Sequence, residues 1–118
     1  MMLNMLHSKL HRVRVTHSEL HYNCSIGIDR DWLNRAGILP GQQVDVLNVN
    51  NVERFTTYAI EEPAGSKNIG IYGAAAHLVD PDDMVIIIAY AQMTPQEAVT
   101  YKPVVLVFDE NSNVIENG

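Results

Sequence analysis

Apolar and polar residues alternate along much of the chain, and this alternation predicts short strands. Leu10, Val13 and Val15 stand among polar partners, which predicts a strand over residues 9–16. Residues 44–49 alternate more strictly. Further strands are predicted to open at Ser25, to run from Arg54 through Ile60, and to cover residues 69–72, 85–89 and 104–108. About seven short strands with only brief helices favour an all-β barrel over alternating strands and helices.

Turn and capping residues separate the predicted strands. Asp29 suits the N-cap of a short helix over residues 31–36, and Gly37 supplies a left-handed residue to end it. Asn50 and Asn51 predict the turn of a hairpin. The remaining predicted features are a turn or helical turn at 18–20, a turn at 40–41, a loop at 63–66, a helical turn at 73–77, a short helix from Pro95 and a polar tail after residue 108.

The composition is that of an ordinary globular protein. We expect the 118 residues to form one domain, residues 1–118, large enough for a hydrophobic core. The longest apolar run, residues 84–91, is too short to cross a membrane. No secretory signal is visible at the N-terminus, so a cytoplasmic protein without a membrane partner is expected. The single cysteine, Cys24, excludes an intrachain disulfide framework and a structural zinc site built on thiolates.

The charge pattern argues against nucleic acid and is compatible with a small anionic ligand. The formal net charge is -6, whereas nucleic-acid binding requires clustered lysines and arginines. Residues 1–60 nevertheless hold six of the eight cations against five acidic residues, whereas residues 61–118 hold two cations against nine. The commoner explanation of Arg12, Arg14, Arg30 and Arg35 is a solvated strand face.

The histidines have a spacing that occurs in metal sites. His7 and His11, and likewise His17 and His21, are four residues apart, which places two rings on one face of a helix. The first pair, however, falls at a predicted strand, and no carboxylate or thiol completes either set. We therefore expect no metal, and His11 is better interpreted as lining a pocket beside Lys9.

Four short blocks carry a family resemblance. They are KLHR at residues 9–12, LHYNCSIGID at 20–29, RFTTY at 54–58 and GAAAH at 73–77. In this order and spacing they resemble the pyruvoyl-dependent aspartate 1-decarboxylases (L-aspartate alpha-decarboxylases), over residues 5–116. The resemblance implies an all-β fold, a six-stranded double-psi β-barrel with short helices, assembled as a homotetramer with sites at subunit interfaces. It also implies conversion of L-aspartate to β-alanine and carbon dioxide, which supplies pantothenate and coenzyme A biosynthesis.

The resemblance further implies that the chain makes its own cofactor. In this family a precursor cuts itself before a serine, which here is Ser25, and that serine becomes a covalent pyruvoyl group. The cut would fall between Cys24 and Ser25 and leave residues 1–24 (β chain) and 25–118 (α chain). The pyruvoyl ketone would form a Schiff base with the substrate amine. Thr57 matches the family threonine that donates to the oxyanion during the cut.

The same resemblance assigns the substrate contacts. Lys9 and Arg54 match the cations that hold the two carboxylates of aspartate, and Tyr58 matches the residue that returns a proton to the α-carbon. Backbone N–H groups of Gly73, Ala74 and Ala75 are a further cradle for a carboxylate. His11, Tyr22, Cys24 and Tyr72 are assigned to the pocket or to processing. The residues alone also allow a surface ion pair for Lys9 and Arg54, a half-buried strand aromatic for Tyr58, and a tight packing site for Gly73.

Four positions depart from the family pattern. Cys24 replaces a glycine and Tyr72 replaces an asparagine at the processing site, while Val52 and Asp82 replace turn glycines. A left-handed conformation costs about 1–2 kcal/mol for a residue with a Cβ. Cys24 is therefore expected to slow the cut if its φ angle must be positive. Two alternatives stay open: an unprocessed or slowly processed relative that keeps the tetrameric barrel, and a barrel-type binding module without catalysis.

Overall fold

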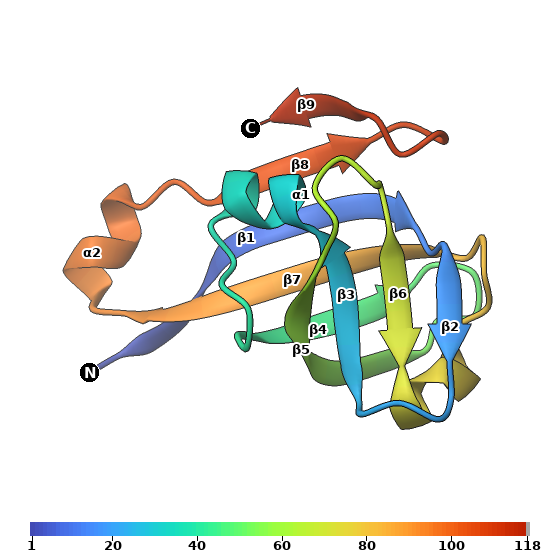
Figure 1. Cartoon of the computed structure of the whole chain (residues 1–118). Coiled ribbons are helices and arrows are strands. Elements are labelled where there is room, and N and C mark those ends of the chain that lie inside the picture. The colour runs from blue at the N-terminus through green and yellow to red at the C-terminus, as the bar shows by residue number, and fades with distance from the viewer. Residues whose placement is uncertain (118) are drawn as a thin grey trace.

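The computed structural model describes residues 1–117 and is built almost entirely of strands (Figure 1). The strands are β1 (Leu3–Arg14), β2 (His17–Glu19), β3 (Ser25–Asp29), β4 (Gln43–Asn48), β5 (Arg54–Glu62), β6 (Ile69–Tyr72), β7 (Met84–Met93), β8 (Val104–Phe108) and β9 (Val114–Asn117). The helices are α1 (Arg30–Ala36), α2 (Pro95–Thr100) and a 3-10 turn, η1 (Gly73–Leu78). The predicted all-β class with short helices is confirmed.

Six chain segments form the barrel. The hydrogen-bonded strand order is β2-β6-β3-β5-β4-β7-β1-β8-β9. Only Val15 and Thr16 separate β1 from β2, and their N–H groups donate to the carbonyls of Asp83 and Ile69 at 2.8 Å each. Because β1 and β2 are parts of one continuous run of chain, the order returns to its start after β7. This six-membered ring agrees with the predicted double-psi barrel, while β8 and β9 extend it on the outside of β1.

Several boundaries differ from the sequence-based predictions. The turn predicted at residues 18–20 is wrong at its start, because His17–Glu19 form β2 and pair in parallel with β6. The first strand begins at Leu3, six residues earlier than predicted, and a register shift between Leu6 and Ser8 interrupts its alternation. The tail predicted after residue 108 contains β9, which pairs with β8. The hairpin of β4 and β5 and the strands at 69–72 and 104–108 are confirmed.

The core fills the barrel from every strand of the ring. Its largest fully buried side chains are Leu10, Val13, Val15, Ile26, Ile28, Leu33, Val44, Val46, Ile69, Ile71, Ile87 and Leu106. Burial of one such side chain contributes about 1.5–3 kcal/mol to stability. Ile26 and Ile28 lie on β3 with Ser25 at its head, so this packing holds the backbone of the predicted cleavage site in place.

Asp29 ends β3 and starts α1, as predicted. Its carboxylate accepts hydrogen bonds from the backbone N–H groups of Asp31 (2.8 Å), Gly65 (3.1 Å) and Lys67 (2.8 Å). Gly37 ends the helix in the left-handed region with φ 74°.

No helix in residues 1–117 is long and apolar enough to cross a membrane.

Two of the substituted turn positions are strained as expected. Val52 has φ 58° and Asp82 has φ 74°, so both occupy the region that favours glycine. A β-branched valine is especially costly there. Cys24, in contrast, is not among the residues with positive φ in the described chain.

Candidate active site

A surface cavity of about 610 Å³ lies where β3, β5 and β6 adjoin. It is lined by His17, Glu19, Tyr22, Asn23, Ser25, Tyr58, Ile60 and Tyr72. Three of the strand ladders converge here: Ser25 pairs with Tyr72 on β6, Ile26 with Ala59 on β5, and Glu19 of β2 with Tyr72. Figure 1 shows the connection between β2 and β3 at the same end of the barrel as η1. The fold therefore gathers Tyr22, Ser25, Tyr58 and Tyr72 around one space.

Ser25 is buried but keeps an almost uncommitted hydroxyl. The residue is 4% exposed, and its only hydrogen bond among the described residues is a long one of 3.4 Å from Oγ to the carbonyl oxygen of Asn23. Its Oγ therefore lies beside the backbone of the segment that precedes it. A weakly held hydroxyl in a buried position is suited to attack on a nearby carbonyl, because little has to be broken first.

The backbone of η1 presses directly against Cys24. Gly73 has φ 79°, and a Cβ added there would lie 2.7 Å from both Cα and Sγ of Cys24. The glycine needed for this approach is thus Gly73, and the strain expected at Cys24 is absent in this structure. Cys24 itself is exposed. Of the two cases left open for Cys24, the structure shows the one without a positive φ, while Gly73 beside it has a positive φ.

Thr57 and His11 carry buried polar atoms without partners. Oγ1 of Thr57 and Nδ1 of His11 are buried and have no hydrogen-bond partner within residues 1–117. Successive residues of a strand point to opposite faces, so Thr57 points away from the cavity that Tyr58 lines. Burial, and then the charges of Lys9 and Arg12, lower the pKa of His11. Its imidazole is therefore neutral near pH 7.

Lys9 and His11 lie far from Ser25 within one chain. Lys9 pairs with Ile88 on β7, Ile88 with Asp45 on β4, and Asp45 with Thr56 on β5. Three strand spacings therefore separate Lys9 from Thr56, about 14 Å measured along the curved sheet. Lys9 and His11 are accordingly not among the residues that line the Ser25 cavity.

Arg54 opens β5 and is exposed, four residues before Tyr58. That separation is about 13 Å along a strand. Among residues 1–117 the ion pair within 4.0 Å joins Arg30 and Glu61, so neither Lys9 nor Arg54 is held by a carboxylate of this chain. Ala74 is exposed and Ala75 half-buried in η1, next to Gly73. One chain thus brings together the processing residues but not the predicted carboxylate-binding cations.

Tyr72 has partners that the sequence did not indicate. Its hydroxyl donates to Oε2 of Glu62 at 2.5 Å and lies 2.6 Å from Nε2 of His17. Burial, followed by the hydrogen bond and charge of Glu62, raises the pKa of Tyr72, so the phenol stays protonated. The available signal was a pair of glycines inside strands, Gly27 and Gly70, since such glycines mark close approach of other groups.

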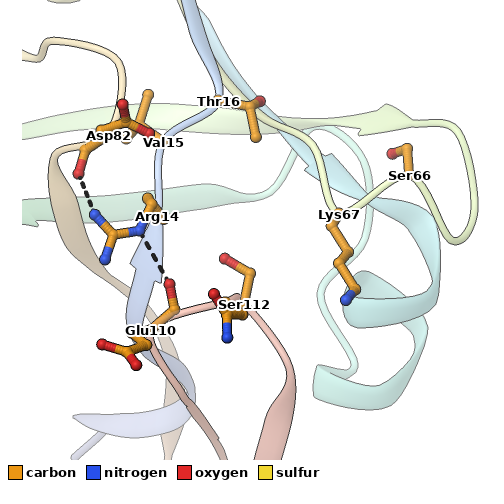
Figure 2. A pocket seen from close by; sticks show the side chains of 9 residues that line it. Arg14, Val15, Thr16, Ser66, Lys67, Asp82, Glu110 and Ser112 are labelled. Atoms are coloured by element: carbon orange, nitrogen blue, oxygen red, sulfur yellow. Dashed lines mark hydrogen bonds between the residues drawn. The ribbon is translucent and has the colours of Figure 1, made fainter.

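A second cavity, of about 590 Å³, lies between the end of β1 and the β8–β9 turn (Figure 2). Arg14 spans it, with Nε donating to the carbonyl of Glu110 at 3.1 Å and Nη1 to that of Asp82 at 2.8 Å. Arg14, which is expected from the sequence to lie on a solvated face, links two loops.

The structure contains no group of three or more His, Cys, Asp or Glu suited to a metal within the described residues.

Comparisons with known proteins agree with this fold and show the family. The rationally designed mkDPBB_sym_86 protein, a double-psi barrel, superposes with a TM-score of 0.51 at 16% identity, covering 66% of this chain and 91% of its own. A family model described as aspartate decarboxylase matches residues 1–115. Aspartate 1-decarboxylase of Maricaulis maris (strain MCS10) is 57% identical over 98% of this chain and 95% of its own. That of Caulobacter vibrioides is 56% identical over 95% of each.

The fold and cavity define a double-psi β-barrel with a buried serine at the head of a strand, beside an exposed connection. Within this class of barrels, the relatives that match nearly the whole chain are named aspartate 1-decarboxylase. The chain belongs to the aspartate decarboxylase family.

Proposed function

We propose that this protein decarboxylates L-aspartate to β-alanine and carbon dioxide, and so supplies pantothenate and coenzyme A biosynthesis. The family and the names of the relatives support the reaction. The observation that carries it for this chain is the buried Ser25, whose hydroxyl is nearly free and whose cavity includes Tyr58.

Self-processing at Ser25 is the first part of the proposal. The Ser25 hydroxyl adds to the Cys24 carbonyl, an ester bond forms, and the peptide C–N bond between the two residues breaks. Elimination then breaks the Ser25 Cβ–O bond and releases residues 1–24 with Cys24 as a carboxylate. Water hydrolyses the dehydroalanine that remains, so that ammonia leaves and residues 25–118 begin with a pyruvoyl group. Thr57 is the oxyanion donor that the resemblance assigns; its buried hydroxyl has no partner within residues 1–117, and it would act from the face of β5 opposite to Tyr58.

The residues around Ser25 fit such a group. Ser25 is already the first residue of β3 and faces a cavity, so a new chain terminus there requires no unfolding of the core. When present, a pyruvoyl group supplies a ketone that binds the substrate amine and withdraws electrons from the α-carbon. Tyr58 is the proposed proton donor after carbon dioxide leaves, which its 40% exposure at the cavity supports.

Lys9 and Arg54 are the proposed holders of the substrate carboxylates, with the N–H groups of Gly73, Ala74 and Ala75. Because neither Lys9 nor Arg54 lines the Ser25 cavity of its own chain, we expect a second copy to supply part of the site. This geometry supports the homotetramer with sites at subunit interfaces that the resemblance implied. His11, neutral beside Lys9, would line the same pocket.

The proposal is tested by replacing the serine and following both mass and product. Ser25→Ala removes the nucleophile and the carbon that becomes the ketone, so both the cut and β-alanine formation should vanish while the far-UV circular dichroism stays that of the parent. Production of β-alanine by Ser25→Ala would refute the proposal. A parent chain that stays at 118 residues and inactive would make it an unprocessed relative.

A further inference from the structure

The hydrogen-bond chain through Tyr72 lies on the outer face of the barrel, over two glycines. Gly27 and Gly70 are register partners on β3 and β6. A Cβ at Gly70 would overlap His17 and Tyr72, and one at Gly27 would overlap Glu62. The paired glycines therefore leave the room in which the three side chains meet.

The chain has a defined direction and two anchored ends. The phenol has one proton, which it donates to Glu62, so Nε2–H of His17 must be the donor to the Tyr72 oxygen. At the other end, Thr16 Oγ1 lies 2.8 Å from Nδ1 of His17 and accepts from the Ile69 N–H at 3.0 Å. Both phenol contacts are short, and one acceptor is a carboxylate, which makes them strong hydrogen bonds.

Three residues of the cleavage segment contact the part of the barrel that this chain anchors. Ser25 is the register partner of Tyr72. Tyr22 packs edge-on against the Tyr72 ring, with centroids 5.7 Å apart. Cys24 contacts the backbone of Gly73, the residue after Tyr72. Movement of Tyr72 would therefore shift both sides of the Cys24–Ser25 bond.

The phenol itself is not a reagent for the cut. Its proton is committed to Glu62, so it is not available to the Ser25 hydroxyl or to a developing oxyanion. Its effect has to pass through the position of its ring and of Gly73. Tyr72 is thus a positioning residue, and the asparagine it replaces in the family could not span the distance to Glu62 and His17 in the same way.

We propose that the His17–Tyr72–Glu62 hydrogen-bond chain holds the 22–25 segment in its cleavage geometry, a role that rests on the proposed self-processing at Ser25. The test follows conversion of the 118-residue chain by intact mass from the start of a short cell-free synthesis. Tyr72→Phe keeps the ring and loses the hydroxyl, so cleavage should slow about tenfold. Glu62→Gln keeps an acceptor oxygen and should slow it about threefold.

Two further measurements separate positioning from general stability. In a double-mutant cycle, Glu62→Gln should add nothing in the Tyr72→Phe background, because the chain is already broken. Arg14→Ala breaks two hydrogen bonds at the other cavity and is the matched control, which should lower Tm without slowing the cut. If Tyr72→Phe fails to fold, the cleavage rate of Glu62→Gln is compared with that of Arg14→Ala instead. Slower cleavage by Glu62→Gln alone would support positioning, and equal rates would contradict it.

The outcomes are distinguishable from failure of the proposed function. Cleavage of Tyr72→Phe and Glu62→Gln at the parental rate would overturn this inference alone. Equal slowing by Arg14→Ala would overturn it as well, since the effect would then be one of stability. A parent chain that yields no 24-residue piece would overturn both this inference and self-processing.

Discussion

The Ser25 cavity and the Arg14 cavity have similar volumes, but their polar groups are held very differently. Around Arg14, the guanidinium donates to two carbonyls and Lys67 Nζ donates to Asn113 at 2.5 Å. Around Ser25, the serine hydroxyl has one long contact and Tyr58 is 40% exposed. Donors that are bound by loop carbonyls hold loops together, whereas donors left nearly free are available for chemistry. This difference, rather than cavity size, distinguishes the proposed active site.

Within the Ser25 cavity, Tyr72 and Tyr58 differ in the same way: the hydroxyl of one has hydrogen-bond partners and that of the other is free within residues 1–117. Tyr72 is engaged by Glu62 and His17, while Tyr58 makes no side-chain hydrogen bond among the described residues. Two tyrosines on one space are thus predicted to have different roles, one in position and one in proton transfer. The predictions below test this division, beginning with the largest effect.

Tyr58→Phe should lower kcat by about 100-fold or more while leaving self-cleavage at the parental rate. The free phenol is needed only after carbon dioxide leaves, so its loss affects turnover alone. Steady-state kinetics with L-aspartate and intact-mass spectra give the two readouts. Near-parental kcat would move the proton donor to water or to another residue.

Arg54→Ala should raise KM about 10- to 100-fold without blocking the cut, because its guanidinium holds a substrate carboxylate. Arg30→Ala is a matched control, since Arg30 is an exposed arginine already paired with Glu61 at 2.9 Å. Unchanged kinetics of Arg54→Ala would show that it is only a surface charge.

Arg14→Ala should lower the free energy of unfolding by about 1 kcal/mol and leave the cleavage rate within a factor of about two. Its hydrogen bonds tie the Asp82 and Glu110 loops to β1 and do not reach Ser25. The change in the free energy of unfolding is measured by chemical denaturation, with Arg14→Ala introduced into the Ser25→Ala protein so that both samples stay uncleaved. A large loss of processing would remove the distinction between the two cavities.

Val52→Gly should raise the free energy of unfolding by about 0.5–1 kcal/mol, because glycine relieves the positive φ of 58°. Thermal denaturation measures the shift, and Val49→Gly, at an exposed site nearby, is the control expected to destabilise. A destabilised Val52→Gly would mean that the turn is not strained.

Cys24→Gly has the smallest expected effect. Since Cys24 lacks a positive φ, glycine relieves no strain there and should leave the cleavage rate unchanged or slow it by up to about threefold through a looser loop. Intact mass over hours of incubation gives the rate. Marked acceleration would show that the reacting conformation differs from this one at Cys24.

The elements could be predicted from the sequence where the apolar alternation or the helix-capping residues were clear. The prediction failed where a strand exists only because it pairs with a neighbouring strand. Asp29 and Gly37 bound α1 as expected. His17–Glu19 contain no apolar residue, and their strand is created by pairing with β6. The register shift after Leu6 breaks the alternation that would have revealed the start of β1.

For the site, the resemblance named candidate residues, and the structure shows which of them lie together. Ser25, Tyr22, Tyr58 and Tyr72 share one cavity, while Lys9 and Arg54 lie apart in a single chain. The engagement of Tyr72 by His17 and Glu62 joins residues 55 and 10 positions away, which no local pattern reports.

The central claim is that Ser25 reacts with the bond before it, and intact mass tests it most directly. The purified parent chain should resolve into a 24-residue piece ending in Cys24 and a 94-residue piece (118 minus 24). The larger piece should be lighter than one beginning with serine, because ammonia has been lost and a ketone formed. An unchanged 118-residue mass after prolonged incubation, or cleavage of Ser25→Ala at the same bond, would contradict the account.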